Sequence, residues 1–207
     1  MAGLGAAGLL VVAVFLLAGG GCGGEGSGGG SVFPEGGEVA EQEVVDLQEA
    51  ADAAGCELEE TRSRGQDDRL HTRSPEVNVD YRDNPPTIGP HWPTGFEAEA
   101  GLYSEPPADE SLVHTLEHGR VIIWAKPSLP EDARQTLRAL FDQDSYQLLV
   151  VPRENMPYAV AATAWNGEPQ PGGTGRTLGC EGWSPEAVDA LRAFRDEHRS
   201  NGPEPAP

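Results

Sequence analysis

Four of the five histidines in the chain lie between positions 71 and 118. Two of them, His114 and His118, are four residues apart in the stretch VHTLEHG, with Glu117 between them. Residues four apart on a helix lie on one face, with Cβ atoms about 5 to 6 Å apart, so two imidazoles there can share one metal ion. The spacing predicts a helical metal site, although the same pair could instead pack or cap a helix end before Gly119.

A third histidine, His91, lies in the proline-rich stretch NPPTIGPHW. Prolines restrict the backbone and can hold an imidazole in a fixed direction. We therefore predict that His91, His114 and His118, with His71 in RLHT as a candidate fourth ligand, bind a transition metal, zinc or copper, rather than a hard cation. The fifth histidine, His198, lies among charged residues near the C-terminus and is predicted to be at the surface.

Glu117 supports a catalytic alternative. H-x-x-E-H is the inverted metallopeptidase pattern, in which the glutamate handles the proton of a metal-activated water. The same letters resemble the zinc motif of S-ribosylhomocysteine lyase, whose thiolate ligand would here have to be Cys180. Glu117 would then be the general base of a metal-dependent hydrolase or lyase, or, without catalysis, a partner of Arg120 or a histidine. A further alternative is a structural or interaction module of the cell envelope, with the histidines in a buried polar network and no metal.

The N-terminus has the layout of an export signal. No charged side chain precedes Glu25, residues 9–17 are apolar, and Cys22 stands where a bacterial lipoprotein is cut and acylated. The alternative, an uncleaved membrane anchor, has an apolar run shorter than the roughly 20 residues of a spanning helix. We expect a signal or anchor over 1–21, a glycine-rich tether over 22–37 and one globular domain over 38–207, on the extracytoplasmic face of the cytoplasmic membrane of a bacterium.

The remaining cysteines and the charge restrict the function further. Cys56 and Cys180 form an even pair in an exported, oxidising setting, which predicts a disulfide worth about 4 to 5 kcal/mol in the chain-entropy model. The alternative is a free thiolate that acts as a ligand or nucleophile. With 34 acidic and 14 basic residues, the net charge of -20 disfavours nucleic acid as a partner. The membrane remains the one expected partner, and the charge identifies no protein partner.

Apolar periodicity and breaker residues predict an α/β (α+β) layered sandwich in a single domain, with a small sheet of about three to four strands and two to four helices. Residues 57–107 are rich in turn formers and are expected to be loop. The expected helices cover residues 38–54, 108–118, 130–143 and 184–200, and the expected strands cover 121–125, 146–152 and 158–165.

Several motifs together resemble the bacterial family called domain of unknown function 3105. They are, in order, NPPTIGPHW, GLYSEPP, VHTLEHGRVIIW and AATAW, and the resemblance extends from about Cys56 to GPE near Pro205. It implies a secreted or membrane-attached protein of actinobacteria or related groups, and the family has no established activity. The residues that match the family's pattern are His71, His91, His114, Glu117 and His118. Ile88 stands where members usually have serine, so the resemblance implies no hydroxyl role there.

Overall fold

The structure is a computed structural model that describes Met1 and residues 31–204. The expected signal or anchor, Cys22 and most of the expected tether lie outside these residues. One mixed sheet has the strand order β1-β6-β5-β3-β4-β2. The strands are β1 (Cys56–Arg62), β2 (Gly101–Leu102), β3 (Val121–Ala125), β4 (Leu148–Pro152), β5 (Val160–Asn166) and β6 (Thr174–Cys180). The helices are α1 (Leu47–Ala54), α2 (Asp109–Glu117), α3 (Glu131–Gln143), α4 (Ala187–His198) and the short 3-10 helix η1 (Gln66–Arg69).

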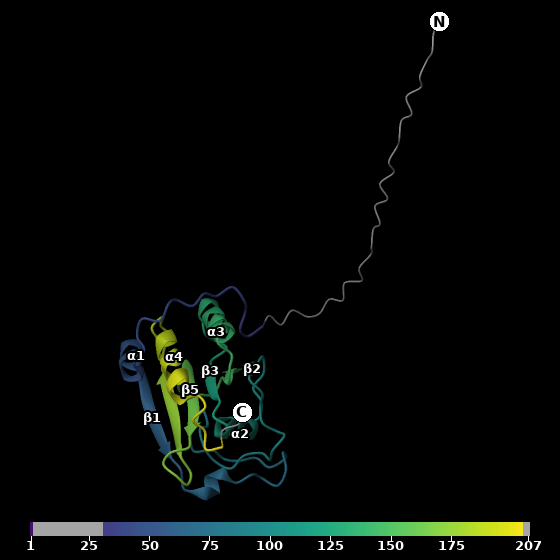
Figure 1. The fold of residues 1–207 in the computed structure, drawn as a ribbon, viewed down its shortest axis with the longest axis vertical. Coiled ribbons are helices and arrows are strands. Elements are labelled where there is room, and N and C mark those ends of the chain that lie inside the picture. The colour runs from purple at the N-terminus through teal and green to yellow at the C-terminus, as the bar shows by residue number, and fades with distance from the viewer. Residues whose placement is uncertain (2–30, 205–207) are drawn as a thin grey trace.

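Both faces of the sheet are covered, which makes a layered α+β domain (Figure 1). Val121 and Ile123 of β3 belong to the apolar core that contains α1, α3 and α4. Ile122 and Trp124 belong to a second core, on the side of α2. Side chains alternate between the faces of a strand, and a strand buried on both faces reads as a continuous apolar run. The stretch VIIWA therefore identifies a central strand of the sheet.

The layered α+β class and the single domain agree with the prediction, but the sheet is larger than the three to four strands expected. The three additional strands, β1, β2 and β6, fall in segments without a strand pattern. β1 reads CELEETR and is mostly exposed at the edge, while β6 reads TGRTLGC and contains glycines. These two strands pair antiparallel along their whole length, from Cys56 opposite Cys180 to Arg62 opposite Thr174. Long-range pairing, which local sequence does not encode, decides these strands.

The disulfide expected between Cys56 and Cys180 is present and joins β1 to β6 across 124 positions of sequence. Each cysteine is also buried in the core shared with α1 and α4. The bond ties the edge strand to the body of the sheet.

The packed part of the chain begins before residue 38, the start that composition indicates. Phe33 is buried in the core, and Arg134 donates a hydrogen bond to the carbonyl of Val32 at 2.7 Å. The first helix begins at Leu47 rather than near residue 38, because Asp46 caps it by accepting from the Glu49 N–H. The buried Phe33 ring and the hydrogen bond from Arg134 hold the segment on the fold.

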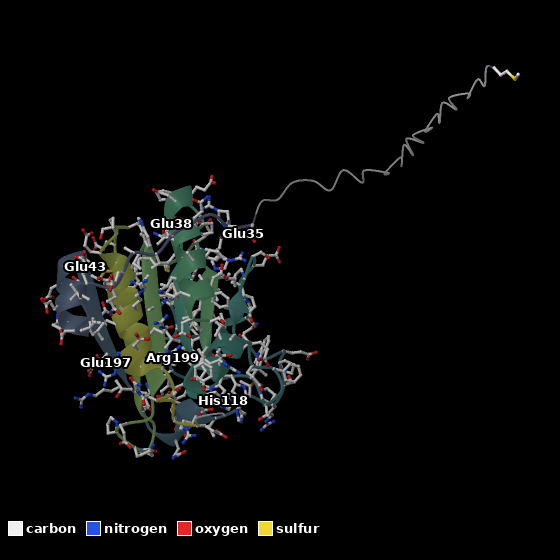
Figure 2. The ribbon with its side chains drawn as sticks, turned by 45° about the horizontal axis from the view of Figure 1, so that its top comes forward. Glu35, Glu38, Glu43, His118, Glu197 and Arg199 are labelled. Atoms are coloured by element: carbon white, nitrogen blue, oxygen red, sulfur yellow. A yellow bond between two sulfur atoms is a disulfide. The ribbon has the colours of Figure 1, made fainter. Side chains whose placement is uncertain are left out.

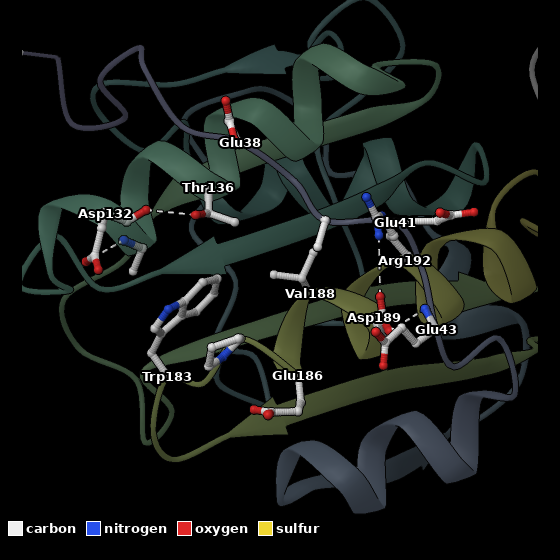
Figure 3. A pocket seen from close by; sticks show the side chains of 13 residues that line it. Glu38, Glu41, Glu43, Asp132, Thr136, Trp183, Glu186, Val188, Asp189 and Arg192 are labelled. Atoms are coloured by element: carbon white, nitrogen blue, oxygen red, sulfur yellow. Dashed lines mark hydrogen bonds and ion pairs between the residues drawn. The ribbon is translucent and has the colours of Figure 1, made fainter.

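Residues 38–43 run across α3 and α4 and enclose a cavity of about 400 Å³ (Figure 3). The Asp189 carboxylate holds this segment by accepting from the N–H groups of Glu43 and Val44 at 3.0 and 3.1 Å. Acidic side chains at the rim, among them Asp132 and Glu186, lie at the first turns of α3 and α4. Carboxylates are favourable there because a helix N-terminus carries partial positive charge.

Candidate metal centre

Helix α2 carries two of the predicted site residues into the protein. Asp109 and Glu110 lie in its first turn, where acidic side chains are stabilising, and the chain leaves the helix at Gly119 with φ +82°. The apolar side of α2 packs in the second core, while His114 and Glu117, three residues apart, are both buried. Neighbours at this spacing share one face of the helix, so both side chains reach the same site.

Two loop histidines, His71 and His91, are brought together by a short parallel bridge. The N–H of Thr72 donates to the His91 carbonyl at 2.7 Å, and the His91 N–H donates to the Leu70 carbonyl at 3.2 Å. Tyr81 fixes the same loop, because its hydroxyl donates to the Pro90 carbonyl at 2.7 Å. The long segment between β1 and α2 is thus ordered at the point where it supplies histidines.

The side chains of His71, His91, His114 and Glu117 converge. Each can offer one ligand atom such that all four atoms lie within 4.8 Å of one another. The ring centroids of the three histidines are 4.9 Å apart in every pair. Only His71 is exposed, and the other three residues are buried.

His91 and Glu117 face each other with their free atoms. His91 Nδ1 lies 2.8 Å from the Gly89 carbonyl, which can only accept, so Nδ1 carries the proton and Nε2 faces the cluster. His91 Nε2 and Glu117 Oε2 are 3.0 Å apart, yet both are buried and neither makes a hydrogen bond. The other oxygen of Glu117 accepts from Arg69 Nε at 2.8 Å. A buried polar atom without a partner is costly, so these two atoms need a cation between them or a proton.

The pKa values of Glu117 and His114 are compatible with metal binding. Burial alone would raise the pKa of Glu117, but His91 and Arg69 outweigh it and lower that pKa to about 2. Burial, and then the neighbouring rings of His91 and His118, lower the pKa of His114 to about 4. Glu117 is therefore ionised and His114 neutral at pH 7, as metal ligands must be.

His118 lies next to the cluster rather than within the converging group. Its Nε2 is 3.1 Å from His114 Nε2, and its Nδ1 is 2.8 Å from the Glu204 carbonyl. In Figure 2, His118 is at the lower end of the molecule, opposite Glu35 and Glu38. The structure thus brings together three of the four predicted histidines and the glutamate, with His118 behind His114.

Two residues of the site were not anticipated from the sequence. Arg69 binds Glu117 from the end of η1, and Glu97 places a carboxylate oxygen 3.9 Å from His114 Nδ1. The sequence around each residue does not mark it as a site residue, because Arg69 lies in a charged turn and Glu97 in a loop. Trp165 could not be paired with the site either, although its ring lies 5.8 Å from that of His91.

The prediction that His198 is a surface residue is wrong. Its side chain is buried, with its ring 4.5 Å from that of Phe194 one helical turn earlier. The charged neighbours Glu197 and Arg199 point to solvent more than His198 does, since the burial of α4 follows its apolar stripe. The sequence could have indicated this burial, because the apolar Phe194 lies four residues before His198 and shares its helix face.

The donor set of three imidazoles and one carboxylate suits a first-row transition metal such as zinc or copper. The thiolate that a lyase site would require from Cys180 is absent, because this sulfur is in the disulfide. Of the helices that the structure describes, none has the length and apolar character needed to cross a membrane.

Comparison with known proteins places the chain in one family. Residues 72–207 match the model of the family described as Protein of unknown function (DUF3105). No match was found among curated proteins or among solved structures. The matched segment begins directly after His71 and contains His91, His114, Glu117 and strands β2 to β6. The chain therefore belongs to the DUF3105 family of proteins of unknown function.

Proposed function

We propose that this protein binds one transition metal ion, zinc or copper, through His71, His91, His114 and Glu117, in a non-catalytic role such as metal sensing or carriage. The observation that carries the proposal is the convergence of four ligand atoms to within 4.8 Å of one another in a largely buried cluster. Convergence of this kind is what separates a metal site from histidines that merely lie near each other in sequence.

The hydrogen bonds around the cluster support a cation at its centre. His91 is oriented by the Gly89 carbonyl and Glu117 by Arg69, the outer-shell arrangement that metal ligands commonly have. The atoms left over are His91 Nε2, His114 Nδ1 and Glu117 Oε2, all buried and without a hydrogen bond. A metal ion would satisfy all three of these atoms at once.

A non-catalytic role is favoured over hydrolysis because both carboxylate oxygens of Glu117 face protein side chains rather than an open substrate site. One oxygen accepts from Arg69 and the other faces His91 at 3.0 Å. A general base needs to reach the proton that it removes, within about 3 Å. The position of Glu117 favours a role as a ligand or as the partner of a ligand.

The test is the metal content of the full chain, produced without a histidine tag and measured by elemental mass spectrometry. We expect about one equivalent of zinc or copper in the wild type and none in His91→Ala/His114→Ala. His198→Gln is the matched control, because it removes a buried imidazole outside the cluster. If neither metal is retained after incubation with zinc and copper salts, the histidines form a structural polar network instead.

The same proposal includes export and tethering at the extracytoplasmic face of the membrane through the N-terminal segment. The support is the apolar run before Cys22, together with the position of His118, which contacts His114, at the end of the fold opposite Glu35 (Figure 2). A tether attached at the end near Glu35 would leave the metal cluster facing away from the membrane. Cys22→Ser is expected to move the protein from the membrane fraction to the soluble envelope fraction, and an unchanged distribution would exclude lipidation.

A further inference from the structure

The side chain of His118 contacts the metal cluster at His114. The two Nε2 atoms are 3.1 Å apart, with the rings tilted by 31°. A neutral imidazole has one N–H and one lone pair, so this contact requires one ring to donate and the other to accept. Which ring donates decides which nitrogen of His114 is free for a metal ion.

The carbonyl of Glu204 decides between the two arrangements. It lies 2.8 Å from His118 Nδ1, and because a carbonyl oxygen only accepts, this Nδ1 carries the proton. The Nε2 of a neutral His118 is then an acceptor, and His114 Nε2–H is the donor. The lone pair of His114 is consequently on Nδ1, the buried atom that has no hydrogen bond.

The segment that carries Glu204 is packed firmly on the end of α2. The Ser200 N–H donates to the Gly119 carbonyl at 2.8 Å, and the Glu204 N–H donates to the Glu117 carbonyl at 3.0 Å. Gly202 lies so close that a Cβ there would be 2.3 Å from the Glu117 carbonyl oxygen. Arg69, which binds Glu117, also lies 3.5 Å from the Glu204 carboxylate.

We propose that His118 is a positioning residue, which, held by residues 200–204, fixes the tautomer of His114 so that His114 presents Nδ1 to the metal ion. This inference rests on the proposed metal binding and gives His118 a role other than that of a ligand. The C-terminal segment is then part of the metal site, although it supplies no ligand to it.

Nuclear magnetic resonance of the full chain tests directly whether His118 fixes the tautomer of His114. Long-range proton to nitrogen-15 correlations in the zinc-free protein are expected to show the proton of His114 on Nε2 and that of His118 on Nδ1. Addition of zinc should shift the Nδ1 resonance of His114 and leave both nitrogens of His118 in their zinc-free pattern. Zinc on the Nε2 atoms of His114 and His118 would overturn the inference and make His118 a ligand.

A second experiment tests the C-terminal segment without touching any imidazole. Gly202→Ala forces its Cβ against the end of α2, and we expect its zinc affinity to fall by about 10- to 100-fold, as for loss of other outer-shell partners. Gly182→Ala is the matched control, because its Cβ would meet nothing within 4 Å. Equal affinities in the two variants would overturn the role of the segment.

Failure of the two proposals is distinguishable. Absence of zinc and copper binding in the wild-type chain contradicts the proposed function. The tautomers are measured in the zinc-free protein. A proton on His114 Nδ1 there contradicts the positioning role of His118, even if the chain binds zinc.

Discussion

His91 Nε2 and Glu117 Oε2 face each other at 3.0 Å inside the protein, and neither atom has a hydrogen bond. His91 lies in a loop and Glu117 in helix α2, so the contact joins the loop to the helix. Each atom is held in place from behind, by Gly89 and by Arg69. Substitutions at these two positions therefore give the most direct tests of the metal centre.

Removal of the Glu117 charge is expected to weaken both the metal site and the fold. In Glu117→Gln the Arg69 guanidinium loses its buried carboxylate partner and keeps only the exposed Glu204, which should lower the free energy of unfolding by about 1 to 3 kcal/mol. Metal content should fall well below that of the wild type, because a neutral amide is a poor ligand for zinc or copper. Urea unfolding with a chelator present measures the first effect, and elemental analysis measures the second.

Glu99→Gln is the control for this charge change, since Glu99 is 82% exposed and pairs only with Arg120 at 3.6 Å. It should leave metal content and stability unchanged. Full metal retention in Glu117→Gln would show that the carboxylate is not a ligand and would leave Glu117 as the partner of a ligand or as a general base.

Metal binding should stabilise the native chain in proportion to its occupancy. Free metal at 100 times the dissociation constant adds about 2.7 kcal/mol, which corresponds to a rise in Tm of about 5 to 10 °C for a chain of this size. The rise should disappear in His91→Ala and persist in His198→Gln. Thermal unfolding with zinc, copper or chelator measures it, and an identical rise in His91→Ala would place the metal elsewhere.

Local pattern was enough to predict several elements of the fold. The continuous apolar run VIIWA corresponds to β3, which is buried on both faces, and the amphipathic stretch from Pro130 to Gln143 corresponds to α3, which buries one face. Histidine spacing likewise indicated that His114 and His118 share a face, and their Nε2 atoms are 3.1 Å apart. These are short-range properties of the chain.

What could not be predicted depends on contacts between distant segments. The bridge that sets His71 beside His91 and the ion pair of Arg69 with Glu117 join residues 20 and 48 positions apart. Strands β1 and β6 were missed for the same reason, since each is stabilised by the other rather than by its own apolar pattern. The distinction between His114 as a ligand and His118 behind it depends on the Glu204 carbonyl, 86 positions from His118.

The disulfide is expected to stabilise the fold without controlling the metal site. Loss of a native disulfide commonly costs about 2 to 5 kcal/mol, and this one closes a loop across 124 positions. Cys56→Ser/Cys180→Ser should therefore unfold at lower urea concentration but still bind about one equivalent of metal, because the cysteines lie in the core on the other side of the sheet. Loss of metal from the folded double variant would contradict this separation.

The free energy of unfolding should fall in acid in two stages, because folding lowers the pKa of several buried groups. Burial lowers the pKa of His114 and of His198 to about 4 from an ordinary 6.5, so the unfolded chain takes up these protons first and stability is lost as the pH falls from 6.5 towards 4. The pKa of Glu117 is lowered to about 2 from 4.5, which adds a further loss between those values. All three contributions are fully present above about pH 7.

Urea midpoints measured across this range with a chelator present test the effect in the metal-free chain. Each buried histidine contributes a slope of about 1.4 kcal/mol per pH unit between its two pKa values. His198→Gln should remove one such contribution, so the free energy of unfolding should change less steeply with pH above pH 4. Glu117→Gln should make this change less steep only at lower pH. A slope above pH 4 that is identical in the wild type and in His198→Gln would mean that folding does not lower the pKa of His198, in conflict with its burial against Phe194 and beside Arg176.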